Sequence, residues 1–328
     1  MLKSILLFVF LFTLKAALGH ERVMDHDFPD PTLIKASDGW YYAYATQGMT
    51  EATVPKLLNI QLARSRDLKS WQHLGDALPN KPSWAKTTQS LWAPHIHFAN
   101  DRYYLYYSAD PDTRDGICLA VAVSSSPRGP FVDSGKPLAC GHTFSFIDPM
   151  VYDDPQTGKP LLYWGSGFEP IRVRPLDSTL INFEPQSKAL ELVAPDKGPS
   201  PAPYTRLLEG AWMLKHEGFF YLFVSGEDCC GTNPKYSVLV LRSLSPTGPF
   251  QWRNNDPKQS VVIQSQGHFI ATGHNAFIHD HQGQLWSFHH GIDKEHPLLL
   301  NPIPGDRINR RILLRTKVDF LDGWPVSH

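Results

Sequence analysis

The sequence predicts an all-β protein, a five-bladed β-propeller, and three observations support this fold class. A short polar turn followed by an aromatic-rich strand recurs five times, with a period of about 60 residues. The intervening segments alternate or run apolar as strands do, and no long amphipathic helix interrupts them. Pro and Gly, at 28 and 23 residues, suit many tight turns. A unit this small cannot bury its own hydrophobic face, so five copies should stack around an axis. A sandwich, the alternative, would not require such a repeat.

The N-terminus has the pattern of an export signal. Lys3 precedes an apolar run, Ile5 to Leu14, and the small residues Ala17 and Gly19 frame a cleavage site. Because this run is about half of the roughly 20 residues that span a membrane, we expect a cleaved leader at 1–19 and one propeller domain at 20–328. The alternative is an ordinary N-terminal helix. A secreted location, extracellular or periplasmic, follows from the first interpretation.

The five copies of the repeat are best aligned on the second residue of the polar turn. These markers are Gly39, Asp101, Gly158, Gly218 and Gly283. Each precedes a strand such as Tyr-Tyr-Ala-Tyr at 41–44 or Tyr-Tyr-Leu-Tyr-Tyr at 103–107. Further strands are expected at 60–65, 118–124, 171–176 and 238–243, and several of them end in a Ser-Pro-x-Gly-Pro-Phe type of turn.

The charge pattern argues against two classes of partner. Formal net charge is −1, with no Lys/Arg cluster, so neither nucleic acid nor an anionic membrane is an expected partner. Aromatic residues make up 12% of the chain, which favours carbohydrate, because aromatic rings cover the apolar faces of sugars. The sequence does not indicate an oligomeric state.

The four cysteines suggest disulfides, since the count is even and the chain carries an export signal. The favoured pairing joins Cys118 to Cys140 and the adjacent Cys229 to Cys230. A crossed pairing remains the alternative. No C-x-x-C or H-E-x-x-H pattern indicates zinc.

Five matched positions predict the site. About nine residues before each turn marker stand Asp30, Trp92, Asp148, Glu209 and His274. These positions fall on the innermost strand of each blade, so they should face one another across the axis. Each acid alone could be a turn former beside Pro or Gly. Three acids at the same position of the repeat are harder to explain as turn formers, because burying them together costs several kcal/mol.

Paired carboxylates are the groups that glycosidic bond cleavage needs. One must be protonated to donate to the leaving oxygen, and one ionised to activate water or to attack carbon. A third can keep the pKa of the acid high and orient it. No cofactor is required for this chemistry.

At this point the mature chain resembles glycoside hydrolase family 43, especially its arabinan-degrading members. The resemblance rests on seven motifs in order, which are His26–Thr32, Leu91–Ile96, Phe146–Pro149, Leu208–Trp212, Cys229–Gly231, Gly273–Asn275 and Asp322–Pro325. It implies a five-bladed propeller and inverting hydrolysis of α-L-arabinofuranosyl linkages in plant cell-wall arabinan or arabinoxylan.

The resemblance also implies roles. Asp30 is the general base, Glu209 the general acid, and Asp148 tunes the pKa of the acid and orients it. His274 would lie beside a hydrated calcium ion, with a hydrogen-bonded core histidine as the alternative.

Five more residues are predicted to contact substrate. Trp92 and Trp212 are candidate sugar platforms, with blade packing as the alternative. Phe28 could line the innermost subsite, although packing is the simpler interpretation. His95 stands where arabinanases have an acid, and Ser166 lies in a segment, Gly165–Pro170, that differs from theirs.

These departures leave exo- and endo-cleavage both open. The rival functions are β-xylosidase activity of the same family and a non-catalytic sugar-binding propeller. A sialidase is less well supported, because the segment from Ser65 to Trp71 lacks the Gly of an Asp-box.

Overall fold

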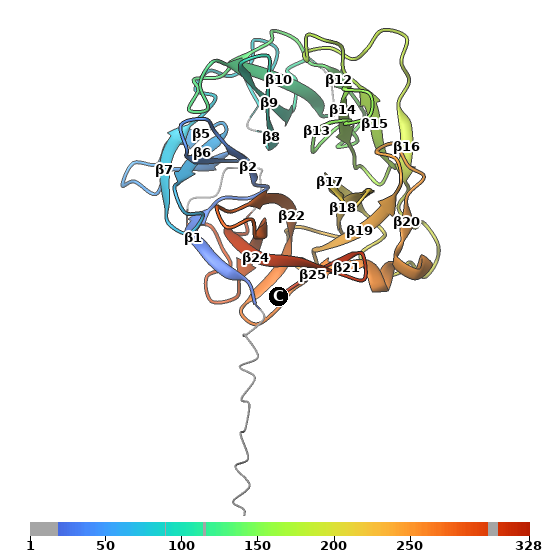
Figure 1. Cartoon of the computed structure of the whole chain (residues 1–328). Helices are drawn as coiled ribbons and strands as arrows, with labels where there is room; N and C mark the ends of the chain where they lie inside the picture. Colours follow the sequence, from blue (N-terminus) through green and yellow to red (C-terminus); the bar gives the residue numbers. More distant parts are fainter. Residues whose placement is uncertain (1–18, 89, 114–115, 301–307) are drawn as a thin grey trace, which may run out of the picture.

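Five antiparallel sheets surround a central axis in the computed structural model, which describes residues 19–88, 90–113, 116–300 and 308–328 (Figure 1). The predicted leader, residues 1–19, lies outside these residues apart from Gly19. Among the described residues, no helix has the length and apolar character needed to cross a bilayer. The predicted five-bladed propeller is confirmed.

The first three blades follow one another along the chain, and each runs outward from its innermost strand. The first blade contains β2 (Thr32–Lys35), β3 (Tyr41–Ala45), β6 (Gln61–Ser65) and β7 (Trp71–Asp76). The second contains β8 (Leu91–Ala99), β9 (Arg102–Ala109), β10 (Cys118–Ser124), β11 (Val132–Asp133) and β12 (Ala139–Cys140). The third contains β13 (Met150–Asp153), β14 (Pro160–Trp164), β15 (Ile171–Pro175) and β16 (Leu190–Val193). A hairpin, β4 (Gly48–Met49) and β5 (Leu57–Leu58), extends from the first blade.

The last blade closes the ring with a strand from the start of the chain. The fourth blade contains β17 (Leu208–His216), β18 (Phe219–Gly226), β19 (Ser237–Ser243), β20 (Gln251–Trp252) and β21 (Val261–Ile263), with 3₁₀ turns η1 (Arg253–Asn255) and η2 (Pro257–Ser260). The fifth contains β22 (Phe269–His279), β23 (Leu285–Asp293), β24 (Arg311–Leu321), β25 (Trp324–Ser327) and β1 (Glu21–Asp27). Because β1 pairs with β24, the two ends of the chain are held in one sheet.

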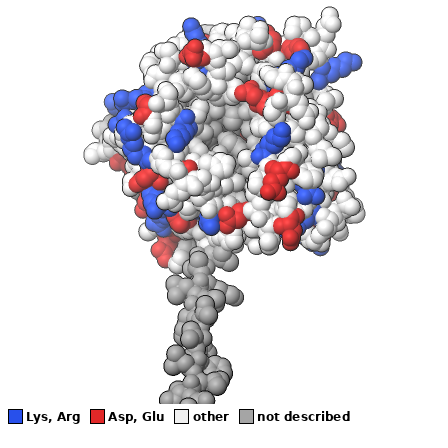
Figure 2. Space-filling model, viewed as in Figure 1, with Lys and Arg blue, Asp and Glu red and all other residues white. Residues whose placement is uncertain are grey.

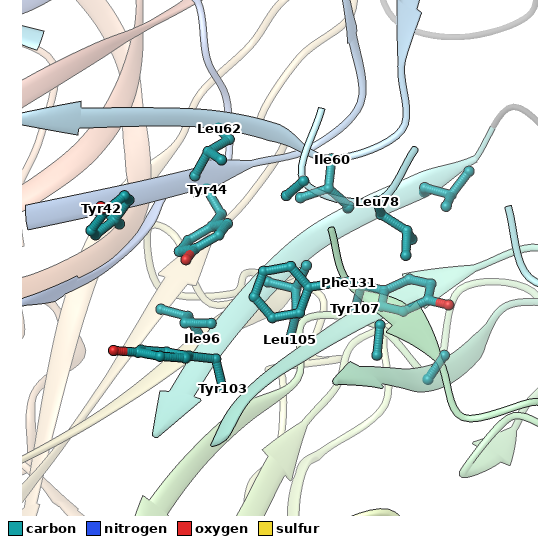
Figure 3. Close-up of a cluster of buried hydrophobic side chains, with 14 of the residues drawn as sticks. Tyr42, Tyr44, Ile60, Leu62, Leu78, Ile96, Tyr103, Leu105, Tyr107 and Phe131 are labelled. Carbon is teal, nitrogen blue, oxygen red and sulfur yellow. The ribbon is translucent and has the colours of Figure 1, made fainter. Parts of the chain in front are cut away.

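The hydrophobic core lies between neighbouring blades. Figure 3 shows the cluster between the first two, where Tyr44 and Leu62 of one blade face Ile96, Leu105 and Tyr107 of the next. All five are almost completely buried. The aromatic strands of the repeat therefore supply the packing surface between blades, which stabilises the ring through buried apolar area.

A recurrent hydrogen bond joins each blade to the outer turn of the next. Tyrosine hydroxyls on the second strands donate to backbone carbonyls there, from Tyr44 to Pro127, Tyr106 to Leu180, Tyr163 to Pro246 and Tyr221 to Gly323. At the closing interface, Arg315 donates to the carbonyl of Leu68 instead. These bonds satisfy the one polar atom of rings that are otherwise packed in the core.

Both favoured disulfides are present. Cys118 and Cys140 are paired residues of β10 and β12, within one blade. Cys229 and Cys230 bond to each other in the loop after β18.

Candidate active site

The five matched positions meet in one cavity on the propeller axis. It has a volume of about 520 Å³, and Asp30, Trp92, Asp148, Glu209 and His274 all line it. The other lining residues are Phe144, Ile147, Leu207, Asp228, Cys229, Cys230, Gly231, Ile308 and Arg311. Figure 2 shows the molecule hollowed at its centre, with residues of both charge signs interspersed around the rim. A second cavity, of about 680 Å³, lies beside β1 and the β4–β5 hairpin and includes none of the three carboxylates.

An unusual backbone conformation places these side chains. In each blade, either the matched position or the residue directly after it adopts positive φ. These residues are Asp30, Ala93, Asp148, Gly210 and His274, with φ between 44° and 58°. On β8, β17 and β22 the pairing register shifts at this point, as in a β-bulge. Such bulges re-aim side chains near active sites. Here the result is that side chains from five separate blades point at one space.

Asp30 is a buried carboxylate surrounded by donors. Arg311 forms a fork with it, at 2.9 Å from Nη1 to Oδ1 and 3.3 Å from Nη2 to Oδ2. The Thr46 hydroxyl donates to Oδ2 at 2.6 Å, and His290 Nδ1 lies 3.1 Å from Oδ1. Burial alone would raise the pKa of Asp30, but the Arg311 charge and the His290 contact outweigh burial and hold the pKa well below its usual range. Asp30 is therefore ionised at neutral pH.

Glu209 has the opposite character. Burial raises its pKa to about 7, against the lowering effect of a hydrogen bond from Tyr236 and with a further raising effect of the Asp30 charge. The Tyr236 hydroxyl donates to Oε1 at 2.8 Å, and Ser166 also hydrogen bonds to this carboxyl. Glu209 is thus the carboxyl that can carry a proton near neutral pH.

Asp148 is coupled to Glu209. Burial, followed by the charges of Glu209 and Asp30, raises the pKa of Asp148 well above its usual range. Its Oδ2 nevertheless accepts the backbone N–H of Gly210 at 2.9 Å, and the Ser108 hydroxyl accepts its own N–H at 3.0 Å. Two carboxyls that interact in this way share a proton as a pair.

His274 lies between the two aspartates. Its Nδ1 is 3.6 Å from Oδ1 of Asp30 and 3.8 Å from Oδ2 of Asp148, and burial lowers its pKa. Among the residues that the structure describes, no group of three His, Cys, Asp or Glu side chains is arranged to hold a metal ion. The calcium ion therefore stays a prediction, in which His274 would hold it through water.

Four other predicted contacts are placed outside the cavity wall. Phe28 is completely buried in the core, and His95 is buried with Nε2 3.1 Å from the carbonyl oxygen of Val151. Trp212 packs edge-on against His95, with ring centroids 5.4 Å apart. Ser166 is buried behind Glu209 and touches the acid rather than the open space. Of the substrate contacts predicted, only Trp92 lines the cavity.

The residues that set the charges of the site were not predicted. Arg311, His290 and Tyr236 come from β24, β23 and the loop before β19, not from the innermost strands. The available signal was composition, since Arg311 adjoins the apolar run Ile312–Leu314, where a charged group needs a partner.

A family model decides what kind of protein this is. The model of glycosyl hydrolases family 43 matches residues 21–325, almost all of the chain described here. The chain belongs to glycosyl hydrolase family 43. It is therefore a glycosidase that cleaves O-glycosyl bonds.

Individual relatives within the family are consistent with the motifs. The extracellular endo-α-(1→5)-L-arabinanase 1 of Bacillus subtilis is 30% identical over 256 residues, covering 75% of this chain and 73% of the relative. The probable arabinan endo-1,5-α-L-arabinosidase A of Aspergillus clavatus is 26% identical over 319 residues, covering 90% and 89%. An exo-1,5-α-L-arabinanase from a bovine ruminal metagenomic library superposes with a TM-score of 0.72 at 25% identity, covering 92% and 97%.

Proposed function

We propose that this family 43 enzyme hydrolyses α-L-arabinofuranosyl linkages in plant cell-wall arabinan or arabinoxylan, with inversion at the anomeric carbon. The observation that carries the proposal is one cavity in which the pKa values of the Asp30 and Glu209 carboxyls are shifted in opposite directions. The names of the relatives support arabinan as the polymer. Export is supported by the apolar leader pattern and by the extracellular Bacillus subtilis relative.

The base in this mechanism is Asp30. As an ionised carboxylate it accepts a proton from water as that water attacks the anomeric carbon. Arg311 and Thr46 hold both carboxylate oxygens in place, which leaves little freedom in the direction of the remaining lone pairs. Fixing the base in this way reduces the entropy cost of the attack.

The acid is Glu209. Its proton is transferred to the glycosidic oxygen as the bond to the sugar breaks. Burial and the charges of Glu209 and Asp30 raise the pKa of Asp148, because ionising a second carboxyl beside the first is disfavoured, and the pair therefore keeps a proton. The Gly210 N–H donates to Oδ2 of Asp148, so this oxygen is an acceptor and the carboxyl is held in a fixed orientation beside Glu209.

Two other functions are outcomes of the same experiment. Matched aryl α-L-arabinofuranosides and aryl β-D-xylosides should be offered to the enzyme, and the products from linear and branched arabinan should then be analysed. The proposal predicts arabinose or arabino-oligosaccharides, and the product lengths report exo or endo mode. Release of xylose alone would indicate the β-xylosidase. A folded protein that releases neither sugar would indicate a sugar-binding propeller.

A further inference from the structure

A histidine pair lies outside the cavity at the start of β1. His20 directly precedes this strand, and its Nδ1 is 3.2 Å from Nε2 of His289 on β23. His289 is completely buried, whereas His20 is partly buried. Successive side chains of a strand point to opposite faces. His290 contacts Asp30, and His289 accordingly faces away from the catalytic site.

The hydrogen bonds of His20 fix where its lone pair lies. Nε2 is 2.9 Å from the carbonyl oxygen of Gln264, which can only accept, so Nε2 carries the hydrogen. In the neutral ring Nδ1 then has the single lone pair, which accepts from the Thr316 hydroxyl at 2.8 Å, so the hydroxyl must turn away for a metal ion to bind there. A carbonyl that holds one ring N–H is the usual support for a histidine whose other nitrogen binds a metal.

The spacing of the two rings suits a shared ion. Nitrogen ligands lie about 2.0–2.1 Å from an ion such as zinc, so two of them are about 2.9 Å apart at a right angle and about 3.4 Å apart in a tetrahedron. The observed 3.2 Å between His20 Nδ1 and His289 Nε2 falls between these values. Two imidazoles alone are a weak site, and a third donor is needed.

Removal of the leader would create that donor. The small residues Ala17 and Gly19 predict cleavage immediately before His20. The new α-amine would belong to His20 itself, so amine and Nδ1 could close one chelate ring on the same ion. We propose that the mature N-terminus of this protein binds a divalent transition-metal ion, copper(II) most tightly, through the His20 amine, His20 Nδ1 and His289 Nε2. Copper(II) is preferred because nitrogen sites follow the general order of divalent affinities.

The first test determines the N-terminus and the stoichiometry. The full chain is secreted with its own leader, and its intact mass is measured. Copper(II) sulfate is then titrated calorimetrically against a competing chelator. We expect a chain that begins at His20, one copper ion per protein, and an electron paramagnetic resonance spectrum with nitrogen ligands. A mature chain that begins elsewhere, or that takes up no stoichiometric copper, would overturn the proposal.

Two variants distinguish a site with three nitrogen ligands from the copper binding that any free N-terminal histidine shows. A chain that retains residues 16–19 before His20 keeps both rings but moves the amine four residues away, and His289→Gln keeps the amine but removes the third nitrogen. Each is expected to bind copper at least tenfold more weakly. If both bind as tightly as the mature chain, the site does not exist. His20→Ala, at the edge of the fold, gives the same comparison should His289→Gln not fold, as judged by circular dichroism.

Discussion

At the residue scale, the site depends on giving similar carboxyl groups different pKa values. Asp30 and Glu209 are both buried, and burial raises the pKa of each. They differ because Arg311 and His290 surround Asp30, while Glu209 has only neutral donors, Tyr236 and Ser166. Burial lowers the pKa of His290 to about 4, so the cationic partner is Arg311, and its charge decides which of the two carboxyls is ionised at neutral pH.

These surroundings predict an asymmetric pH profile. The base must be ionised, so on the acidic side kcat/KM for an arabino-oligosaccharide should stay constant until the pH is below the ordinary range of a carboxyl, where Asp30 takes up a proton. The acid must be protonated, so kcat/KM should also fall as pH rises through about 7, where Glu209 loses its proton. A profile that stays flat to pH 9 would contradict the assignment of Glu209.

Tyr236→Phe should move one limb of that profile. The hydroxyl stabilises ionised Glu209, so its loss raises the pKa of Glu209 and shifts the alkaline limb upward, by up to about one pH unit. The ring is completely buried and stacks on His290 at 5.5 Å, and Phe preserves that packing. The acidic limb should stay in place. A downward shift of the alkaline limb in a folded variant would contradict this account.

At the element scale, the site depends on one left-handed residue on or just before the innermost strand of each blade. Gly210 shows this most clearly, because its N–H binds Asp148 and its φ is +58°. A Cβ added there would lie 3.2 Å from Nδ1 of His274 and 3.4 Å from Oγ of Ser225. The backbone of this position is therefore fitted to its neighbours across the cavity.

Gly210→Ala is expected to lower both stability and activity. The left-handed backbone costs a non-glycine residue about 1–2 kcal/mol, and the new methyl presses on His274. Thermal unfolding and kcat/KM measure the two effects. Gly218→Ala is the matched control, since φ is +84° there but a Cβ meets nothing within 4 Å, and it should lose stability alone. Equal loss of kcat/KM in both variants would contradict the argument.

Strand-level patterns also explain which predictions succeeded. The polar turn and aromatic strand repeat because every blade needs them, so their period located the innermost strands and the five matched positions. His95 was predicted to contact the substrate because it stands where arabinanases have an acid, three residues after Trp92. The register shift between these residues instead turns His95 toward Val151 on β13.

The partners of the carboxylates could not be read in the same way. Arg311 and His290 belong to other strands of the fifth blade, and Tyr236 lies just before β19. These side chains point toward the axis because of the way whole blades pack together. The spacing of residues along the chain does not predict that packing. Phe28 shows the converse, because an aromatic residue close to a catalytic acid is buried in the core.

At the scale of the whole molecule, the ring is stabilised by five interfaces of one design. Each combines an aromatic cluster with a hydrogen bond to the outer turn of the next blade. The closing interface uses β1, so the strand that carries the chain into Asp30 also completes the fifth sheet. Ring closure and the position of the base are consequently linked.

Tyr163→Phe tests the contribution of one such bond. The hydroxyl donates to the Pro246 carbonyl at 2.7 Å in a buried interface, and its loss leaves that acceptor without this donor. We expect the free energy of unfolding to fall by about 1–3 kcal/mol in denaturant titration. Adding Tyr44→Phe, at a separate interface, should give an additive loss. A single variant as stable as the parent would show that the bond contributes nothing.

The central claim, that Asp30 and Glu209 divide the work of base and acid across one cavity, is tested most directly by varying the leaving group. Hydrolysis of arabino-oligosaccharide and of dinitrophenyl α-L-arabinofuranoside should be compared for the parent, Glu209→Gln and Asp30→Asn. Glu209→Gln should lose about 10²–10⁴-fold on the oligosaccharide and far less on the dinitrophenyl substrate, whose leaving group needs no proton. Asp30→Asn should lose activity on both. Unchanged turnover of the oligosaccharide by Glu209→Gln, or an equal loss on the two substrates, would contradict the account.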